Sequence, residues 1–312
     1  MREVGIVISP AELDAGPWLD WIEETALTLL VFHAGPQGLI DFVSSEAGAN
    51  LLSQARSRRI EIEYSMHALS YLLPRGLFKE HPDWFRLDAR GERAPDSNLC
   101  PSSAGAMDFL RERVKGLAAS LVSTTSRYHF WADDGGKWCH CESCAGLSAS
   151  DQNMLAMNAL LQGVRAQDPE GKLSYLAYNE AAAPPEMVAP APGIFLEFAP
   201  IERCFRHSLG DEKCAVNRPI ARRAKALTAL FDAAQGMVLE YWLDASLFAN
   251  WKPDVRVRVP TTEEVIAHDV RFYSSLGFDC FTTFGVFLNS KYVAAFGEPP
   301  LKIYGRAAGV CR

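Results

Sequence analysis

Short apolar runs alternate with longer amphipathic segments along the whole chain. Such runs are typical of strands buried on both faces of a parallel sheet, and segments with helical periodicity are typical of the helices that connect these strands. The pattern predicts strands at residues 4–9, 27–33, 61–67, 128–132, 173–178, 194–198, 237–242 and 279–284. The intervening segments predict helices at residues 39–58, 106–121, 151–165 and 219–234.

A further helix is expected to start at the capping sequence Thr261-Thr262-Glu263-Glu264. Residues 291–296 are the last clearly helical segment before Pro299-Pro300, so we expect the closing helix to be irregular. This order of strands and helices predicts a single (β/α)8 TIM barrel that spans residues 1–312 as one catalytic-type domain. A doubly wound open sheet is the alternative, but it usually has a glycine-rich turn after its first strand, and Ser9-Pro10-Ala11-Glu12 has none.

Two connections are unusual for a plain barrel. The polar excursion between the third strand and the helix at 106–121 is too long for a simple connection. The connection after the fourth strand begins Asp133-Asp134-Gly135-Gly136-Lys137-Trp138 and continues Cys139-His140-Cys141-Glu142-Ser143-Cys144. We therefore predict a barrel with a long βα3 excursion and a cysteine-bearing βα4 loop.

Composition narrows the class of protein. The 312 residues include 48% hydrophobic and 22% charged residues, as in an ordinary globular protein. The formal charge of -7 and the absence of a basic run argue against nucleic acid as a partner. The apolar run at the N-terminus is too short for a secretory signal or a membrane segment, which predicts a cytoplasmic protein with no membrane partner. The sequence indicates no oligomeric state.

Acidic residues follow several predicted strands, at the end of a barrel where active sites lie. They are Asp133, Asp134, Glu180, Glu197, Glu240 and Asp244. Glycoside hydrolysis needs two carboxyl groups, or one carboxyl and a substrate amide, at the scissile bond. Repulsion within an adjacent pair, together with partial burial, raises the proton affinity of one member and leaves the other charged. The pair Asp133 and Asp134 is therefore the predicted catalytic centre.

Aromatic residues at the same strand ends supply flat faces that stack on sugar rings. A carbohydrate is therefore the predicted partner, and the predicted substrate-binding residues are His67, Trp138, Tyr178, Glu180, Glu197, Glu240, Trp242 and Asp244. His67 fits either a buried hydrogen-bonded histidine or a ligand-facing one. Asp-Asp-Gly-Gly is also a good turn sequence. Both aspartates can face the cavity only if the strand ends between them, because successive strand residues point in opposite directions.

The spacing of Cys139, Cys141 and Cys144 suits thiolates that converge on one zinc ion. A structural site requires a fourth ligand, and the candidates are Cys100, His140, Cys204 and Cys214. A reducing compartment disfavours a disulfide. The acidic pair needs no cofactor for catalysis, so the expected role of a zinc ion is structural.

Several strings resemble an uncharacterised bacterial glycosidase-like family related to α-glucuronidases and β-N-acetylhexosaminidases on a TIM barrel. They are Trp131-Ala132-Asp133-Asp134-Gly135-Gly136 with the following Cys-x-Cys-x-x-Cys, His81-Pro82-Asp83-Trp84-Phe85, Leu99-Cys100-Pro101-Ser102 and Pro200-Ile201-Glu202-Arg203-Cys204-Phe205-Arg206-His207. The resemblance covers roughly residues 78–285. It implies that Asp133 orients a substrate acetamido group and that Asp134 is the general acid/base, without a protein nucleophile.

The predicted function is hydrolysis of a small glycoside or an oligosaccharide. Three alternatives stay open. Asp134 could act as the acid with Glu197 or Glu240 as nucleophile or base. The barrel could bind carbohydrate without turnover, since a fold does not guarantee an activity. The chain could be a metal-dependent enzyme centred on the cysteine loop.

Overall fold

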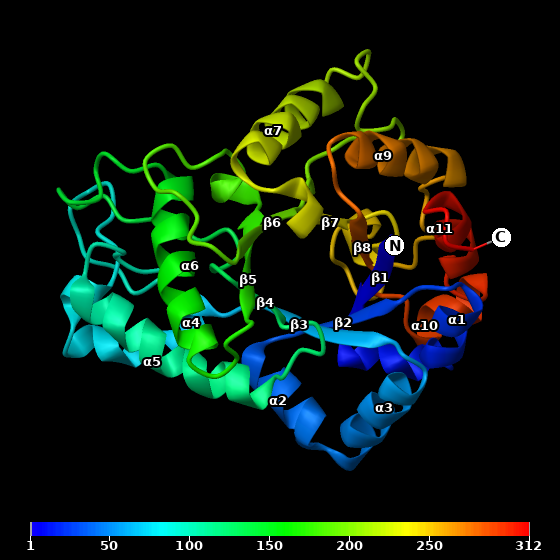
Figure 1. Cartoon of the computed structure of the whole chain (residues 1–312), viewed down its shortest axis with the longest axis horizontal. Coiled ribbons are helices and arrows are strands. Elements are labelled where there is room, and N and C mark those ends of the chain that lie inside the picture. Colours follow the sequence, from blue (N-terminus) through cyan, green and yellow to red (C-terminus); the bar gives the residue numbers. More distant parts are fainter. Residues whose placement is uncertain (1, 312) are drawn as a thin grey trace. The chain divides into compact units, whose positions relative to one another are not determined.

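The computed structural model describes residues 2–311, and its eight parallel strands close into a barrel in sequence order (Figure 1). The strands are β1 (Glu3–Ile8), β2 (Leu29–His33), β3 (Glu61–His67), β4 (Arg127–Trp131), β5 (Lys172–Ala177), β6 (Ile194–Phe198), β7 (Met237–Glu240) and β8 (Cys280–Phe284). Their residues are almost all buried, as the short apolar runs indicate. The predicted (β/α)8 barrel is confirmed.

The helices follow the strands as predicted, with several short additions. The α-helices are α1 (Trp18–Glu24), α2 (Pro36–Ser44), α3 (Glu46–Ser57), α4 (Leu69–Leu72), α5 (Ala104–Ser120), α6 (Ala149–Arg165), α7 (Asn217–Leu230), α8 (Ala245–Phe248), α9 (Glu263–Ser275), α10 (Ser290–Phe296) and α11 (Leu301–Ala307). Short 3-10 helices are η1 (Pro10–Ala15), η2 (Arg75–Lys79), η3 (Pro82–Trp84), η4 (Asn179–Ala181) and η5 (Ala233–Gln235). None of the described helices is long and apolar enough to cross a membrane.

Two helix predictions were wrong in detail. The single helix predicted at residues 39–58 is divided into α2 and α3, because Ser45 between them accepts a hydrogen bond from the Gly48 amide (3.0 Å) and caps α3. The closing helix is regular, since α11 follows Pro299-Pro300 directly. Its buried Tyr304 hydroxyl lies 3.1 Å from the Gly5 carbonyl oxygen and 3.0 Å from that of Phe281, within hydrogen-bonding distance of both β1 and β8.

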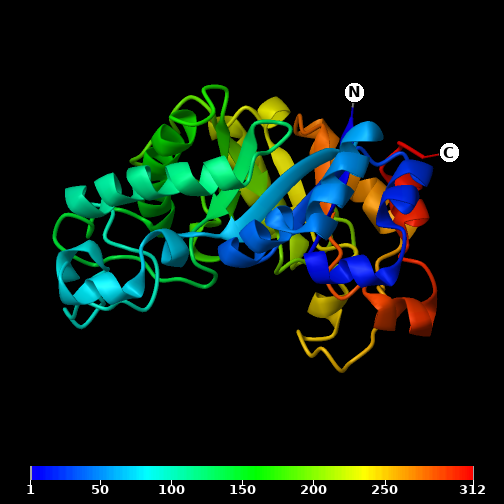
Figure 2. The same cartoon turned by 90° about the horizontal axis from the view of Figure 1, so that it is seen from below.

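The chain divides into two compact units. The central unit comprises Gly35–Ile40 and Tyr64–Leu196, and the terminal unit comprises the remaining described residues. In the central unit, α5 and α6 lie side by side and α6 packs on β5 (Figure 1). Gly163 allows this close approach of the two helices, because a Cβ atom there would lie 2.3 Å from the Arg111 carbonyl oxygen of α5. Figure 2 shows the long excursion, with α4, η2 and η3, beside α5.

In the terminal unit, β1 pairs with β2 and β8, and β7 pairs with β8 and with the end of β6. Helices α9 and α11 lie against each other (Figure 1). The capping sequence before α9 acts as predicted, because Thr262 accepts a hydrogen bond from the Val265 amide (3.3 Å). Each unit thus has its own set of strand ends, where polar side chains gather.

Candidate active site

The acidic pair lies in a turn beyond strand β4, which ends at Trp131. The Gly136 amide donates to the Asp133 carbonyl oxygen (3.0 Å), and Gly135 has a φ of +59°, which glycine adopts without strain. The turn interpretation of Asp-Asp-Gly-Gly is therefore confirmed. Because the strand has ended, the alternation of side chains along β4 no longer dictates where the two aspartates point.

Asp133 is held by the long excursion on both carboxylate oxygens. Oδ1 accepts from the Ser70 amide (2.9 Å), and Oδ2 accepts from the Asn98 amide (2.7 Å) and pairs with the Arg75 guanidinium. The Asp133 amide in turn donates to Asn98 Oδ1 (2.9 Å). Asp133, Ser70, Asn98 and Arg75 are here called the Asp133 network. Within it, the Asp133 side chain is 13% exposed.

Asn98 joins the excursion to the turn. It is fully buried with a φ of +40°, a conformation that asparagine tolerates better than most residues. Its side chain donates to the Lys137 carbonyl oxygen (3.1 Å), and its own carbonyl oxygen accepts from Arg75 (2.7 Å). Burial lowers the pKa of Arg75, and the charge of Asp133 opposes that shift. Neither Asn98 nor Arg75 is predicted from the sequence; the length of the excursion is the one signal that points to them.

Asp134 has a different environment from Asp133. Its side chain is exposed, and Asn179 Nδ2 lies 3.4 Å from its Oδ1 atom. Asn179 opens η4 with a φ of +47°, two residues after the end of β5, and Glu180 follows it at the exposed surface. The pair therefore consists of one enclosed carboxylate and one that faces solvent.

His67 lies at the end of β3, where its ring contacts Trp131 edge-on (5.3 Å between ring centroids). Its Nδ1 atom is 2.5 Å from the Ala132 carbonyl oxygen. A carbonyl oxygen only accepts, so Nδ1 carries a hydrogen, and in the neutral ring Nε2 is the acceptor. This contact fixes both the tautomer and the position of the ring beside the acidic turn.

A cleft of about 400 Å³, open solvent included, lies over these strand ends. Five predicted site residues line it together, namely His67, Asp133, Trp138, Tyr178 and Glu180. Trp131, Asn98 and Asn153 line it as well. Asn153 is 3% exposed, and its Oδ1 atom accepts no hydrogen bond within the described part of the chain. Sequence reasoning missed Asn153, because an asparagine within helix α6 gives no signal of its own.

The other predicted substrate-binding residues belong to the terminal unit. Glu197 is buried on β6, Glu240 ends β7, and Trp242 and Asp244 follow it. Asp244 caps α8, because its Oδ1 atom accepts from the Ser246 amide (3.0 Å); the Ser246 hydroxyl also donates to Oδ1 (2.6 Å). Burial raises the pKa of Asp244.

Glu240 and Trp242 lie in a buried ionic network of the terminal unit. Arg203 donates to Glu240 Oε1 (2.5 Å) and to Asp269 Oδ2 (2.6 Å), and all three side chains are 0% exposed. Tyr273 donates its hydroxyl to Glu240, and the Trp242 indole donates to Asp269 (2.9 Å). Burial raises the pKa of Glu240 and of Asp269, and Arg203 opposes both shifts. These five residues are called the Arg203 network.

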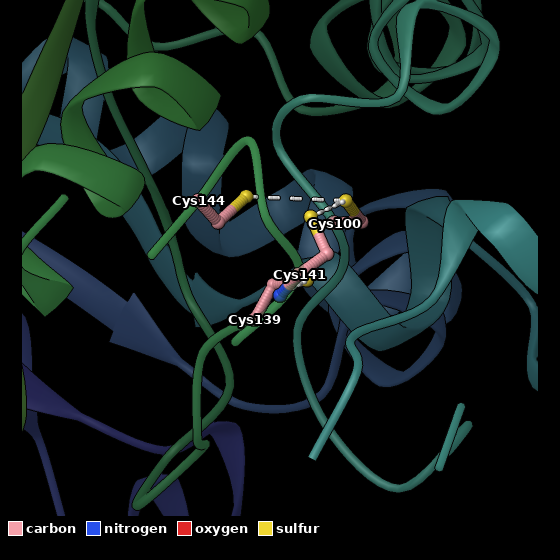
Figure 3. Close-up of side chains that lie close together, drawn as sticks. All are labelled: Cys100, Cys139, Cys141 and Cys144. Carbon is pink, nitrogen blue, oxygen red and sulfur yellow. Dashed lines mark hydrogen bonds between the residues drawn. The ribbon is translucent and has the colours of Figure 1, made fainter. Parts of the chain in front are cut away.

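Four cysteines converge in the central unit, as Figure 3 shows. The sulfur atoms of Cys100, Cys139, Cys141 and Cys144 all lie within 4.8 Å of one another. Hydrogen bonds from the Cys100 and Cys144 thiols hold the pKa of Cys139 well below its usual range. Of the four candidates for a fourth ligand, Cys100 is the one that joins the cluster.

The alternative candidates lie elsewhere. Cys204 and Cys214 gather with His207 in the terminal unit, where Cys204 Sγ is 3.3 Å from His207 Nδ1. His140 is exposed, and its amide donates to the Leu87 carbonyl oxygen (2.8 Å). Neither group adds a ligand to the predicted cysteine loop.

Comparison with models of protein families identifies the family of this chain. A family model described as "Domain of unknown function (DUF4838)" matches residues 21–289. The chain belongs to the DUF4838 family. A search of curated proteins finds no match to this DUF4838 chain.

The DUF4838 chain also resembles solved structures of carbohydrate-active enzymes. An endo-β-mannanase/endo-β-glucanase of Prevotella bryantii matches with a TM-score of 0.54 and 12% identity over 98% of this chain, which spans 48% of that protein. A Rhizomucor miehei chitinase matches with a TM-score of 0.52 and 9% identity, over 98% of this chain and 100% of its own. A Paenibacillus polymyxa β-amylase catalytic domain matches with a TM-score of 0.50 and 8% identity, over 98% and 96% respectively. At these identities, the DUF4838 chain shares a fold with glycoside hydrolases.

Proposed function

We propose that this chain is a glycoside hydrolase that acts on a small glycoside or an oligosaccharide in the cleft of the central unit. The observation that carries the proposal is that Asp133 and Glu180 line one cleft together with two indoles and a phenol, while Asp134, next to Asp133, lines an adjoining recess with His67. Flat aromatic faces and hydrogen-bonding side chains are what a sugar ring requires. The fold shared with a mannanase, a chitinase and an amylase supports the same class of substrate.

Asp134 is the proposed general acid/base. It is exposed and held by only one side-chain contact in the central unit, from Asn179, so it is accessible to a glycosidic oxygen. Asp133 is the proposed orienting group, and the backbone amides and Arg75 that hold it fix its position. One lone pair of Oδ1 stays available for a substrate N–H, because that oxygen accepts a single bond from the protein.

A structural role is proposed for Glu240 rather than that of nucleophile or base. Its carboxylate has no exposed surface and is occupied by Arg203 and Tyr273. Glu180 is the proposed second carboxylate of the cleft, since it lines the same cavity as Asp133 and is exposed. A relation to α-glucuronidases or β-N-acetylhexosaminidases remains a prediction.

A second function, carbohydrate binding without turnover, is favoured by one observation. Asp133, the carboxylate of the pair that lines the cleft, already accepts hydrogen bonds from three protein groups, and Asp134 does not line the cleft. A binding protein needs no acid with a free proton. The two functions differ in what Asp134 does, and that difference can be measured.

The test is a panel of chromogenic glycosides that includes N-acetylglucosaminide, glucuronide and neutral hexosides. Wild type is expected to cleave at least one, and Asp134→Asn is expected to lose about 10²–10⁴-fold in kcat, as general acids do. Glu170→Gln removes an exposed carboxylate of the same unit and should leave kcat unchanged. Sugar binding by calorimetry, equal in wild type and Asp134→Asn and without any product, would instead establish the binding protein.

A further inference from the structure

The cysteine cluster has the dimensions of a metal site. In a tetrahedral zinc site with bonds of about 2.3 Å, two sulfur ligands lie about 3.8 Å apart. Cys100 Sγ is 3.7 Å from Cys141 Sγ and 4.0 Å from Cys144 Sγ. A disulfide would need a separation of about 2.05 Å. Figure 3 shows three of the sulfurs turned toward one another, with Cys100 on one chain segment and the others on a second.

Two of the sulfurs, those of Cys139 and Cys144, have hydrogen-bond donors around them that suit thiolates. The Leu87 and Cys141 amides lie 3.2 Å and 3.4 Å from Cys139 Sγ and donate to it. The Arg93 guanidinium is 3.8 Å from the same sulfur, and the Ser102 hydroxyl is 3.0 Å from Cys144 Sγ. Four thiolates on one divalent cation carry a net charge of about -2, which the cationic Arg93 and these donors offset.

We propose that Cys100, Cys139, Cys141 and Cys144 bind one zinc ion that clamps the excursion to the βα4 loop. Four sulfur ligands in tetrahedral reach favour zinc among common divalent ions. With four protein ligands, three of them buried, the ion has no open position for water, as in structural zinc sites.

The position of the ion gives it a role in the candidate active site. Cys100 follows Asn98 by two residues, and Cys139 follows the acidic turn, so the ion joins the two segments that carry the Asp133 network. Helix α6 fixes the second segment, because Gln152 bonds the Cys139 amide (3.0 Å) and carbonyl group (3.1 Å). Loss of zinc should therefore loosen the hold of Asn98 on Asp133.

Metal content tests the assignment. Protein expressed in zinc-supplemented medium is expected to contain one zinc ion per chain, as measured by inductively coupled plasma mass spectrometry. Cys144→Ser should lose it, whereas Cys204→Ser, in the cluster of the terminal unit, should keep it. Iron in place of zinc, retention of zinc in Cys144→Ser, or loss of zinc in Cys204→Ser would overturn the proposal.

A second measurement does not depend on the folding of a cysteine variant. Wild type produced in cobalt-supplemented medium should show intense sulfur-to-cobalt charge-transfer bands and the visible bands of a tetrahedral site. A mercurial reagent should then release one equivalent of metal. Bands without thiolate character, or a protein mass that reports a disulfide, would contradict the assignment.

Hydrogen exchange locates the effect of the ion. After metal release, the Asn98 and Asp133 amides should lose protection, while the amide of Leu209, which donates to Asp269 in the terminal unit, should keep its own. Unchanged protection at Asn98 would refute the clamp even if zinc is bound. None of these readouts requires glycosidase activity, so failure of the proposed function and failure of the zinc site are separable.

Discussion

The two units each build a network of one arginine and carboxylate groups, but under opposite conditions. In the Arg203 network, the arginine and both carboxylates have no exposed surface. In the Asp133 network, the Arg75 side chain is 25% exposed and the Asp133 side chain 13% exposed, at the edge of a cleft. A buried charge must be paired or it destabilises the fold, whereas a pair at the surface contributes little to stability. The same chemical groups are therefore fully buried in one unit, whereas in the other they hold a carboxylate in place beside a cleft.

Removal of Arg203 from its network in the terminal unit should have the largest effect on the free energy of unfolding. Arg203→Leu leaves Glu240 and Asp269 buried without their partner, so we expect a loss of about 3–5 kcal/mol in the free energy of unfolding. Urea denaturation followed by circular dichroism measures it. Arg223→Leu, which breaks the more exposed pair with Glu202, is the matched control and should cost about 0.5 kcal/mol or less. Equal losses in the two variants would refute the distinction.

Loss of one neutral donor from the Arg203 network should have an intermediate effect. Tyr273→Phe removes the hydroxyl that donates to Glu240 and changes little else in volume. Because the acceptor is a buried carboxylate, we expect a loss of about 1.5–3 kcal/mol in the same denaturation experiment. Tyr71→Phe in the central unit is the control, because Tyr71 is only half-buried. A Tyr273→Phe variant as stable as wild type would show that the remaining partners, Arg203 and the Tyr241 amide, satisfy Glu240.

Substitutions in the Asp133 network should disturb the position of the Asp133 carboxylate more than they lower the free energy of unfolding. A double-mutant cycle of Arg75→Met and Asp133→Asn should give a coupling energy of about 1–2 kcal/mol, less than in the fully buried network, because solvent still reaches part of this pair. If the proposed function holds, the same variants should lower kcat far more than that energy implies. A coupling energy as large as that of the buried network would mean that Asp133 is a stability element.

The smallest expected effect is a pH dependence of the free energy of unfolding, which arises from Asp88 in the excursion. The Glu92 amide holds the pKa of Asp88 at about 2, below its ordinary value of 3.8. The Asp88 carboxylate thus contributes stability above pH 3.8, and this contribution is lost as the pH falls through about 2. The difference in unfolding free energy between wild type and Asp88→Asn should therefore shrink between pH 4 and pH 2. A difference that stays constant over this range would contradict the shifted pKa.

The barrel could be predicted from the sequence because each strand is a short apolar run with a helical segment after it. The division of α2 from α3 was missed, since one capping serine breaks a segment whose apolar periodicity continues. The carboxyl ends of strands pointed to Asp133, His67 and Tyr178, which do line one cleft. Asn98 and Arg75 escaped detection, because contacts made across 35 and 58 residues of chain leave no local pattern.

The backbone conformation and the contacts of Asn98 restrict which amino acids its position tolerates. Glycine would satisfy the backbone at a φ of +40° but would offer no acceptor to the Asp133 amide. Aspartate would offer the acceptor, but it would set a second negative charge against Asp133 and remove the donor to Lys137. Most other side chains would strain the backbone. A loop position that accepts a single amino acid would appear in saturation mutagenesis as a sharp minimum among tolerant neighbours.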